Sequence, residues 1–224
     1  EACDHILEAT DSSLERIAIP WLHVLNEHPA NLVRYAGLID SGRPALIQAV
    51  KRNLRTLWGM RPRFSREESW YGPDALPDRA DVVIISHLLN VSQVGASEDF
   101  YFGQLPEALE ERGLTTVVAL RDHTGLDPQR LARCLPSTGA SRVLFSKTIG
   151  WLGEVALLRR LSREAAALGR AGNKVESGLQ KRVWEAAAAQ AMTPSSVASL
   201  RLYIQVQTLV ERLRPKSIVV TYEG

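Results

Sequence analysis

The segment from residue 81 to residue 113 restricts the possible fold more than any other part of the sequence. It opens with Val82-Val83-Ile84-Ile85, an apolar run rich in β-branched residues, as is typical of a strand buried on both faces of a sheet. A polar loop, an amphipathic stretch at residues 105–112 and a second β-rich run at 115–120 follow. This order of strand, loop, helix and strand predicts a βαβ unit in a parallel sheet.

The remainder of the chain extends this pattern. Two more apolar runs, at residues 142–146 and 217–222, predict further strands, and residues 127–134 predict a short helix with Pro128 in its first turn. Helices are also expected at 152–168, around residues 175–183 and from Thr193-Pro194 onward, with a turn at 169–173. The last helix is expected to bury Leu202, Tyr203, Val206, Leu209, Val210 and Leu213. The predicted fold class is α/β, a Rossmann-like parallel sheet flanked by helices.

The N-terminal part of the chain has a different character. Residues 1 to about 60 contain no convincing strand, and residues 61–79 hold three prolines and Gly72, which indicates a linker with Trp70 and Tyr71 as its packing anchor. We therefore predict a mostly helical N-terminal segment and linker over residues 1–77 and an α/β domain over 78–224. The chain begins with Glu1 rather than Met and ends in a strand-like run, so we expect a piece of a longer protein.

Charge is concentrated on one predicted helix that begins at Pro44. From Arg43 to Arg66 there are seven basic residues and no acidic one. A solvated helix face is the favoured interpretation, and peripheral contact with anionic lipid head groups at the inner membrane is the alternative. The formal net charge of +2 gives no argument for nucleic acid as a partner. Two cysteines without a CxxC pair and the lack of a bilayer-length apolar run favour a cytoplasmic protein.

Polar residues follow each predicted strand. The four runs end in Ser86-His87, Asp122-His123, Ser146-Lys147 and Tyr222-Glu223. In open α/β sheets, ligands bind outside the carboxyl ends of the strands, where the strand order reverses. Because parallel strands bring these ends to one edge, the pattern predicts a binding crevice there.

Two of these residues are candidates for a catalytic base. A histidine ordinarily titrates near neutral pH, so His87 is a candidate to remove a proton from an attacking hydroxyl group, although a strand-end histidine can instead bond a nearby carbonyl. Glu223 has a suitable position for the same role, or it lies in solvent at the chain end. Asp122, His123 and Lys147 are candidate substrate-binding residues. Their alternative roles are an Asx-type turn begun by Asp122, a structural role for His123 and a solvated Lys147.

The loop from residue 90 to residue 103 is long for a connection between a strand and a helix, and such loops are often functional. It places Asn90 and other polar residues beside Phe100-Tyr101-Phe102. Sugars need hydrogen bonds for their hydroxyl groups and a ring for their C–H faces, so Asn90 and Tyr101 are predicted to bind substrate. Phe100 and Phe102 are equally expected to dock into the core.

Several chemistries lack their sequence signature. No GxGxxG follows the first strand, and no P-loop, HExxH or GxSxG motif occurs. The five histidines and two cysteines do not have metal-ligand spacing, so no metal is expected.

Three short stretches point to a family. Residues 85–90 (ISHLLN), 100–109 (FYFGQLPEAL) and 220–224 (VTYEG) resemble bacterial surface-carbohydrate biosynthesis proteins, of O-antigen or capsule, related to two-domain glycosyltransferases. The resemblance implies the N-terminal, acceptor-side half of a GT-B type enzyme. It also implies that the nucleotide-sugar donor is held mainly by a C-terminal domain that this chain lacks, and that no metal or other cofactor is required.

The function expected from this resemblance is transfer of a sugar from a nucleotide-sugar to a surface polysaccharide or lipid-linked glycan at the cytoplasmic membrane face. Alone, this chain is expected to be inactive. A non-catalytic domain that binds a glycan or a partner of surface-carbohydrate assembly is the first alternative. A polyol-phosphate transferase is the second.

Overall fold

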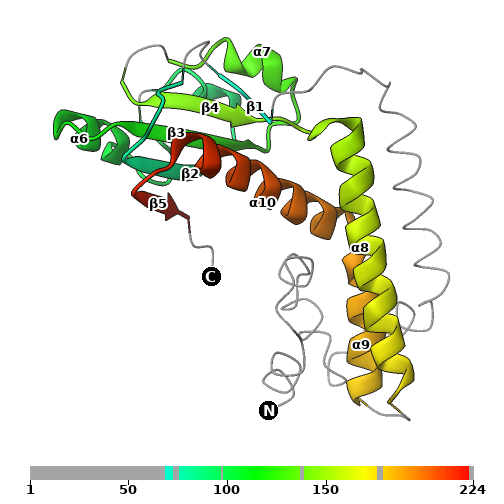
Figure 1. The fold of residues 1–224 in the computed structure, drawn as a ribbon. Coiled ribbons are helices and arrows are strands. Elements are labelled where there is room, and N and C mark those ends of the chain that lie inside the picture. Colours follow the sequence, from blue (N-terminus) through cyan, green and yellow to red (C-terminus); the bar gives the residue numbers. More distant parts are fainter. Residues whose placement is uncertain (1–68, 73–75, 97, 137–138, 176–178, 222–224) are drawn as a thin grey trace. The chain divides into compact units, whose positions relative to one another are not determined.

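The computed structural model describes residues 69–72, 76–96, 98–136, 139–175 and 179–221 (Figure 1). The strands are β1 (Trp70–Tyr71), β2 (Val82–Leu88), β3 (Thr116–Asp122), β4 (Ser141–Phe145) and β5 (Ser217–Val220). The helices are the 3-10 helix η2 (Val91–Gln93), α6 (Leu105–Glu111), α7 (Pro128–Ala132), α8 (Gly150–Asn173), α9 (Leu179–Ala191) and α10 (Pro194–Leu213). The predicted helix that begins at Pro44, the basic stretch from Arg43 to Arg66 and the residue Glu223 lie outside the described residues.

The strands form one sheet in the order β1-β4-β3-β2-β5. Strands β2, β3, β4 and β5 are parallel, and β1 pairs antiparallel with β4. The predicted α/β fold with a mostly parallel sheet is confirmed. The order β4-β3-β2-β5 is that of the first four strands of the Rossmann arrangement, in which the order reverses between the first and fourth strands. Here that position lies between β2 and β5.

Both faces of the sheet are covered, since alternate residues of each strand point to opposite sides. Val83 and Ile85 of β2 pack in one apolar cluster with Leu209 and Leu213 of α10. Ile84 and Leu88 lie in the other cluster, together with Leu131 of α7 and Leu109 of α6. The uninterrupted apolar run at residues 82–85 follows from this burial on both sides.

The structure also corrects three expectations about the helices and the linker. Trp70 and Tyr71 form the edge strand β1, although Trp70 does pack against the core as predicted. Tyr203 is exposed rather than buried. The predicted turn at residues 169–173 is wrong because α8 continues through Asn173. A Cβ atom at Gly172 would lie 3.0 Å from Trp184 Cβ, so this glycine permits the close approach of α9 rather than a turn.

The chain divides into two compact units. Among the described residues, one unit contains α8, α9 and the first turns of α10, up to Arg201; the other contains the sheet, α6, α7 and residues 202–221. Within the helical unit, Arg201 forms two hydrogen bonds with the buried Glu154, of 2.6 Å and 2.8 Å. The predicted domain boundary near residue 77 stays a prediction, since most of residues 1–77 are not described.

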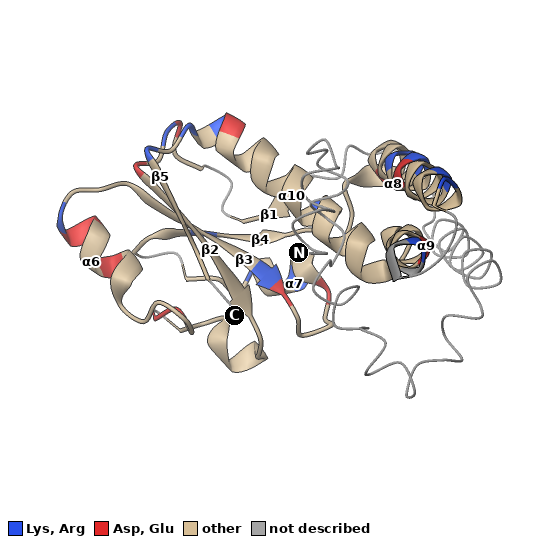
Figure 2. Cartoon of the chain, turned by 90° about the horizontal axis from the view of Figure 1, so that it is seen from below, with Lys and Arg blue, Asp and Glu red and all other residues tan. Residues whose placement is uncertain are grey.

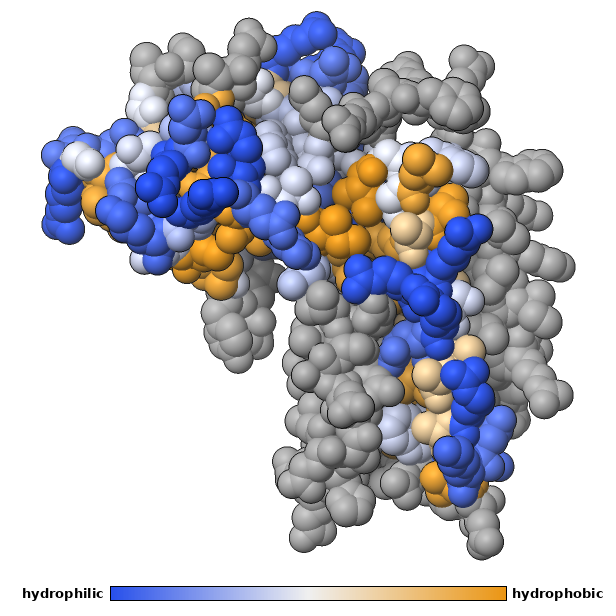
Figure 3. Space-filling model, in the orientation of Figure 1, coloured by the Kyte–Doolittle hydropathy of each residue, from blue (hydrophilic) through white to orange (hydrophobic). Residues whose placement is uncertain are grey.

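Among the described strands, β5 lies at the edge of the sheet opposite β1. Its described pairing is with β2, and its residues Ile218 and Val220 expose 47% and 59% of their surface. Figure 3 shows apolar surface, in orange, on the side of the sheet where Figure 1 labels β5. In the part of the chain that the structure describes, no helix combines the length and the apolar character needed to cross a membrane.

Candidate functional site at the carboxyl edge of the sheet

Strand β2 runs further than its apolar run predicts. It continues through Ser86 and His87 to Leu88, which pairs with Asp122 of β3. The ladder extends one step more, because the His123 amide donates to the Leu88 carbonyl over 2.9 Å. His87 therefore lies within the strand rather than in the loop after it, and the backbone holds His87 and His123 in a fixed relation. Strand β3 ends in two charged residues, Arg121 and Asp122, and Figure 2 shows blue followed by red at the end of this strand.

The two histidines form a hydrogen-bonded pair. His87 Nδ1 lies 2.8 Å from His123 Nε2, and the ring planes differ by 29°. The ring centroids are 5.0 Å apart, which is close to the N···N distance plus one ring radius on each side. The contact is therefore edge to edge along the ring planes, as an N–H···N bond requires, and not a face-to-face stack. One proton is shared between the two nitrogens, so at least one of these two imidazoles is neutral while the bond exists.

Tyr101 closes one side of this pair. Its ring centroid is 5.6 Å from that of His87, with the planes tilted by 59°. Phe100 packs edge-on against Tyr101 at a centroid distance of 5.0 Å and exposes 60% of its surface. Phe102 is partly buried against the core, as predicted, whereas Phe100 is not. An imidazole pair thus lies beside two accessible aromatic rings.

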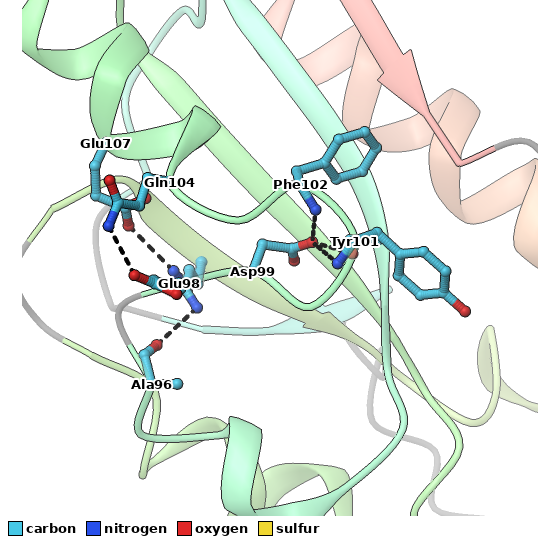
Figure 4. Close-up of polar contacts among 9 residues, drawn as sticks. Ala96, Glu98, Asp99, Tyr101, Phe102, Gln104 and Glu107 are labelled. Atoms are coloured by element: carbon cyan, nitrogen blue, oxygen red, sulfur yellow. Dashed lines mark hydrogen bonds and ion pairs between the residues drawn. The ribbon is translucent and has the colours of Figure 1, made fainter.

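The loop that carries these rings is held by Asp99. Asp99 is buried, and its Oδ1 accepts hydrogen bonds from Ser86 Oγ at 2.8 Å and from the amides of Tyr101 and Phe102 at 2.9 Å and 3.0 Å (Figure 4). Asp99 and Gly103 also exchange two backbone hydrogen bonds. Neither Ser86 nor Asp99 was predicted to be a site residue. The signal that was present is a serine directly after a fully apolar run, which indicates a buried hydroxyl group that needs a partner.

Asp122 and Lys147 form a second cluster at the same edge. Asp122 Oδ1 accepts from the amide and the hydroxyl group of Thr124, which is the Asx-type turn considered above. Its other oxygen is buried, has no hydrogen-bond partner among the described residues and lies 3.9 Å from Lys147 Nζ. Lys147 donates to the carbonyls of Gly125, at 3.1 Å, and Leu126. The lysine thus ties the turn after β3 to the end of β4.

The predicted site residues therefore fall into separate groups. His87, His123 and Tyr101 are together, and Asp122 pairs with Lys147. By the alternation along β3, Asp122 belongs to the opposite face of the sheet from His123. Asn90 caps η2: its Oδ1 accepts from the Ser92 amide at 3.2 Å. The substrate-binding roles of these residues stay predictions.

The described residues contain no group of three or more His, Cys, Asp or Glu side chains arranged to hold a metal ion. Comparison of the chain with protein-family models, with curated proteins and with solved structures found no match. The function must therefore be inferred from the residues described above.

Proposed function

We propose that this chain is the acceptor-side domain of a glycosyltransferase that adds a sugar to a surface polysaccharide or lipid-linked glycan at the cytoplasmic membrane face. The observation that carries the proposal is the hydrogen-bonded pair of His87 and His123. It lies at the carboxyl edge of a parallel sheet, next to the reversal of strand order between β2 and β5. Ligands of open α/β sheets bind at this position.

The pair has the chemistry of an oriented general base. In the tautomer in which His87 Nδ1–H donates to His123 Nε2, the lone pair of His87 Nε2 can accept a proton. His123 then fixes the ring and, by accepting the Nδ1–H bond, stabilises the positive charge that develops on His87; a carboxylate has this orienting role in a Ser-His-Asp triad. The neighbouring Tyr101 ring offers a face for the C–H groups of the acceptor sugar.

The reaction follows from these roles. The acceptor hydroxyl oxygen forms a bond to the anomeric carbon of the donor sugar while its proton passes to His87. The bond from the anomeric carbon to the nucleotide phosphate oxygen breaks, and the nucleoside diphosphate leaves. The donor would be held mainly by a second α/β domain, so the transfer reaction is proposed for a protein that contains both domains. Peripheral membrane contact through the stretch from Arg43 to Arg66 belongs to the same proposal.

The test uses the product of the complete reading frame, incubated with nucleotide-sugars and lipid-linked acceptors, with product masses as the readout. His87→Asn keeps a side-chain N–H close to the position of Nδ1 and removes the titrating nitrogen. We expect this variant to fold normally and to lose about 10²- to 10⁴-fold in kcat. If His87→Asn and Glu223→Ala both retain normal turnover, the assignment of the base is wrong. A product that gains a polyol phosphate instead of a sugar would contradict the sugar-transfer proposal itself.

A non-catalytic glycan-binding domain is the second candidate, and the exposure of Phe100 and Tyr101 favours it. Exposed aromatic rings beside hydrogen-bonding side chains serve binding without any base. Calorimetric titration of the 224-residue chain with acceptor glycans would detect binding under either function. The candidates differ in the transfer assay: glycan binding that persists in His87→Asn, with no sugar transfer by the complete wild-type protein, would favour the binding domain.

A further inference from the structure

We infer that Asp99 is a positioning residue, whose bonds to Ser86 and to the loop backbone hold Tyr101 as a wall of the site beside His87. A role of Asp99 in catalysis rests on the proposed function. The role of Asp99 in fixing the position of Tyr101 is independent of that function.

A buried hydrogen bond between Ser86 and Asp99 ties the loop to strand β2. Ser86 is fully buried in β2, and its hydroxyl group donates to Asp99 Oδ1 over 2.8 Å. Asp99 is 5% exposed and is thirteen positions away from Ser86 in the chain. A buried hydroxyl and a buried carboxylate that bond each other fix the loop at one point, because separating them would leave both without this partner in an apolar setting.

Asp99 also fixes the backbone of the two aromatic residues that follow it, Tyr101 and Phe102. The same Oδ1 atom accepts the amides of Tyr101 and Phe102, and Asp99 and Gly103 close the loop through N–H···O bonds of 2.9 Å and 2.8 Å. Gly103 has a φ of 54°, which glycine adopts without steric cost. Figure 4 shows the two amides converging on the Asp99 carboxylate while the rings of Tyr101 and Phe102 project in different directions. Phe102 packs against the core, and Tyr101 contacts His87.

The alternation of side chains along β2 places the two contacts of the loop on opposite faces of the sheet. Ser86 and His87 are consecutive, so their side chains point to opposite faces of the sheet. The loop contacts both of them, through Asp99 and Tyr101 respectively. It therefore straddles the end of β2, and the distance from Tyr101 to His87 depends on the bond that Asp99 makes on the far side of the strand.

The experiment measures the ring-proton resonances of His87 by NMR, assigned by their loss in His87→Asn. The ring current of Tyr101 displaces these resonances, and Tyr101→Ala gives their positions without it. We expect Asp99→Ala to move them most of the way to the Tyr101→Ala positions. Asp99→Asn should restore the wild-type positions, because its amide oxygen can accept the same three hydrogen bonds. Glu98→Ala is the matched control, since this neighbouring acidic residue is exposed and bonds Gln104 instead.

Wild-type His87 resonances in Asp99→Ala, or an equal displacement in Glu98→Ala, would overturn the inference. If Asp99→Ala does not fold, Ser86→Ala decides, since it removes one of the three donors; a shift toward the Tyr101→Ala positions supports the inference and no shift overturns it. In the transfer assay, Asp99→Ala should raise the acceptor KM, and Asp99→Asn should not. If the wild-type protein transfers no sugar, the proposed function fails while the NMR result still stands.

Discussion

Replacement of Gln205 by leucine should loosen the end of strand β4. Gln205 is buried on α10, and both hydrogens of its amide nitrogen are used: Nε2 donates to the Ser69 carbonyl at 3.0 Å and to the Ser146 carbonyl at 2.8 Å. The Ser69 carbonyl also accepts from the Ser146 amide, at 3.1 Å, and so keeps a partner in the variant. The cost therefore falls mainly on the Ser146 carbonyl. Leaving a buried acceptor unsatisfied costs about 1–3 kcal/mol.

The measurement is native-state hydrogen exchange of the Ser146 amide, which reports local opening without assuming that both units unfold together. A loss of this size should speed its exchange about 5- to 150-fold in Gln205→Leu. The matched control is Gln207→Leu on the same helix, where an exposed amide bonds Glu211 at 2.9 Å and contributes about 0.2–0.5 kcal/mol. Exchange of Ser146 at the wild-type rate in Gln205→Leu would refute the reasoning.

Two further predictions concern stability. Gly72→Ala would place a Cβ atom 2.8 Å from Val143 Cγ1, so we expect a loss of about 1–3 kcal/mol in urea unfolding, against little change for Gly95→Ala, where no atom of the described residues lies within 4 Å of the new Cβ; equal losses would contradict the steric explanation. The hydrogen bond from Lys216, together with a backbone amide, lowers the pKa of Asp81 below its ordinary 3.8. Such a group stabilises the fold above its ordinary pKa, and this stability is lost as the pH falls through the lowered value. Lys216→Met should therefore lower the urea midpoint at neutral pH but not far below pH 3.8, and an equal change at both would exclude this ionisation as the cause.

Much of the architecture was predictable because buried parallel strands leave a strong local signal. The runs at residues 82–85 and 115–120 gave the βαβ unit, and Thr193-Pro194 marked the start of α10. Strand β1 was not predicted because it has only two residues, Trp70 and Tyr71, directly before Gly72 and Pro73, and so has no periodic pattern. Only its pairing with β4 makes it a strand. The end of α8 was misplaced because Gly172 serves contact with α9, which no local pattern records.

The sequence predicts at which edge of the sheet the candidate site lies, but it does not predict which side chains of the site contact one another. Consecutive strand ends placed His87 and His123 on the same edge, yet their hydrogen bond depends on the exact pairing of β2 with β3. Asp99 could not be selected, since its importance comes from a buried partner, Ser86, thirteen positions earlier. Residue type and order locate polar strand ends. The distances between them are set by long-range packing.

The adjacency of Ser86 and His87 has a consequence for how the site can be assembled. A displacement of β2 by a single residue along its neighbours would exchange the directions of all its side chains. The histidine would then enter the buried position under the loop, and the serine would take the place beside His123. Such a slip would break the hydrogen bond between His87 and His123 and the bond from Ser86 to Asp99 in one event. Correct alignment of β2 with its neighbours and the formation of both contacts therefore arise together.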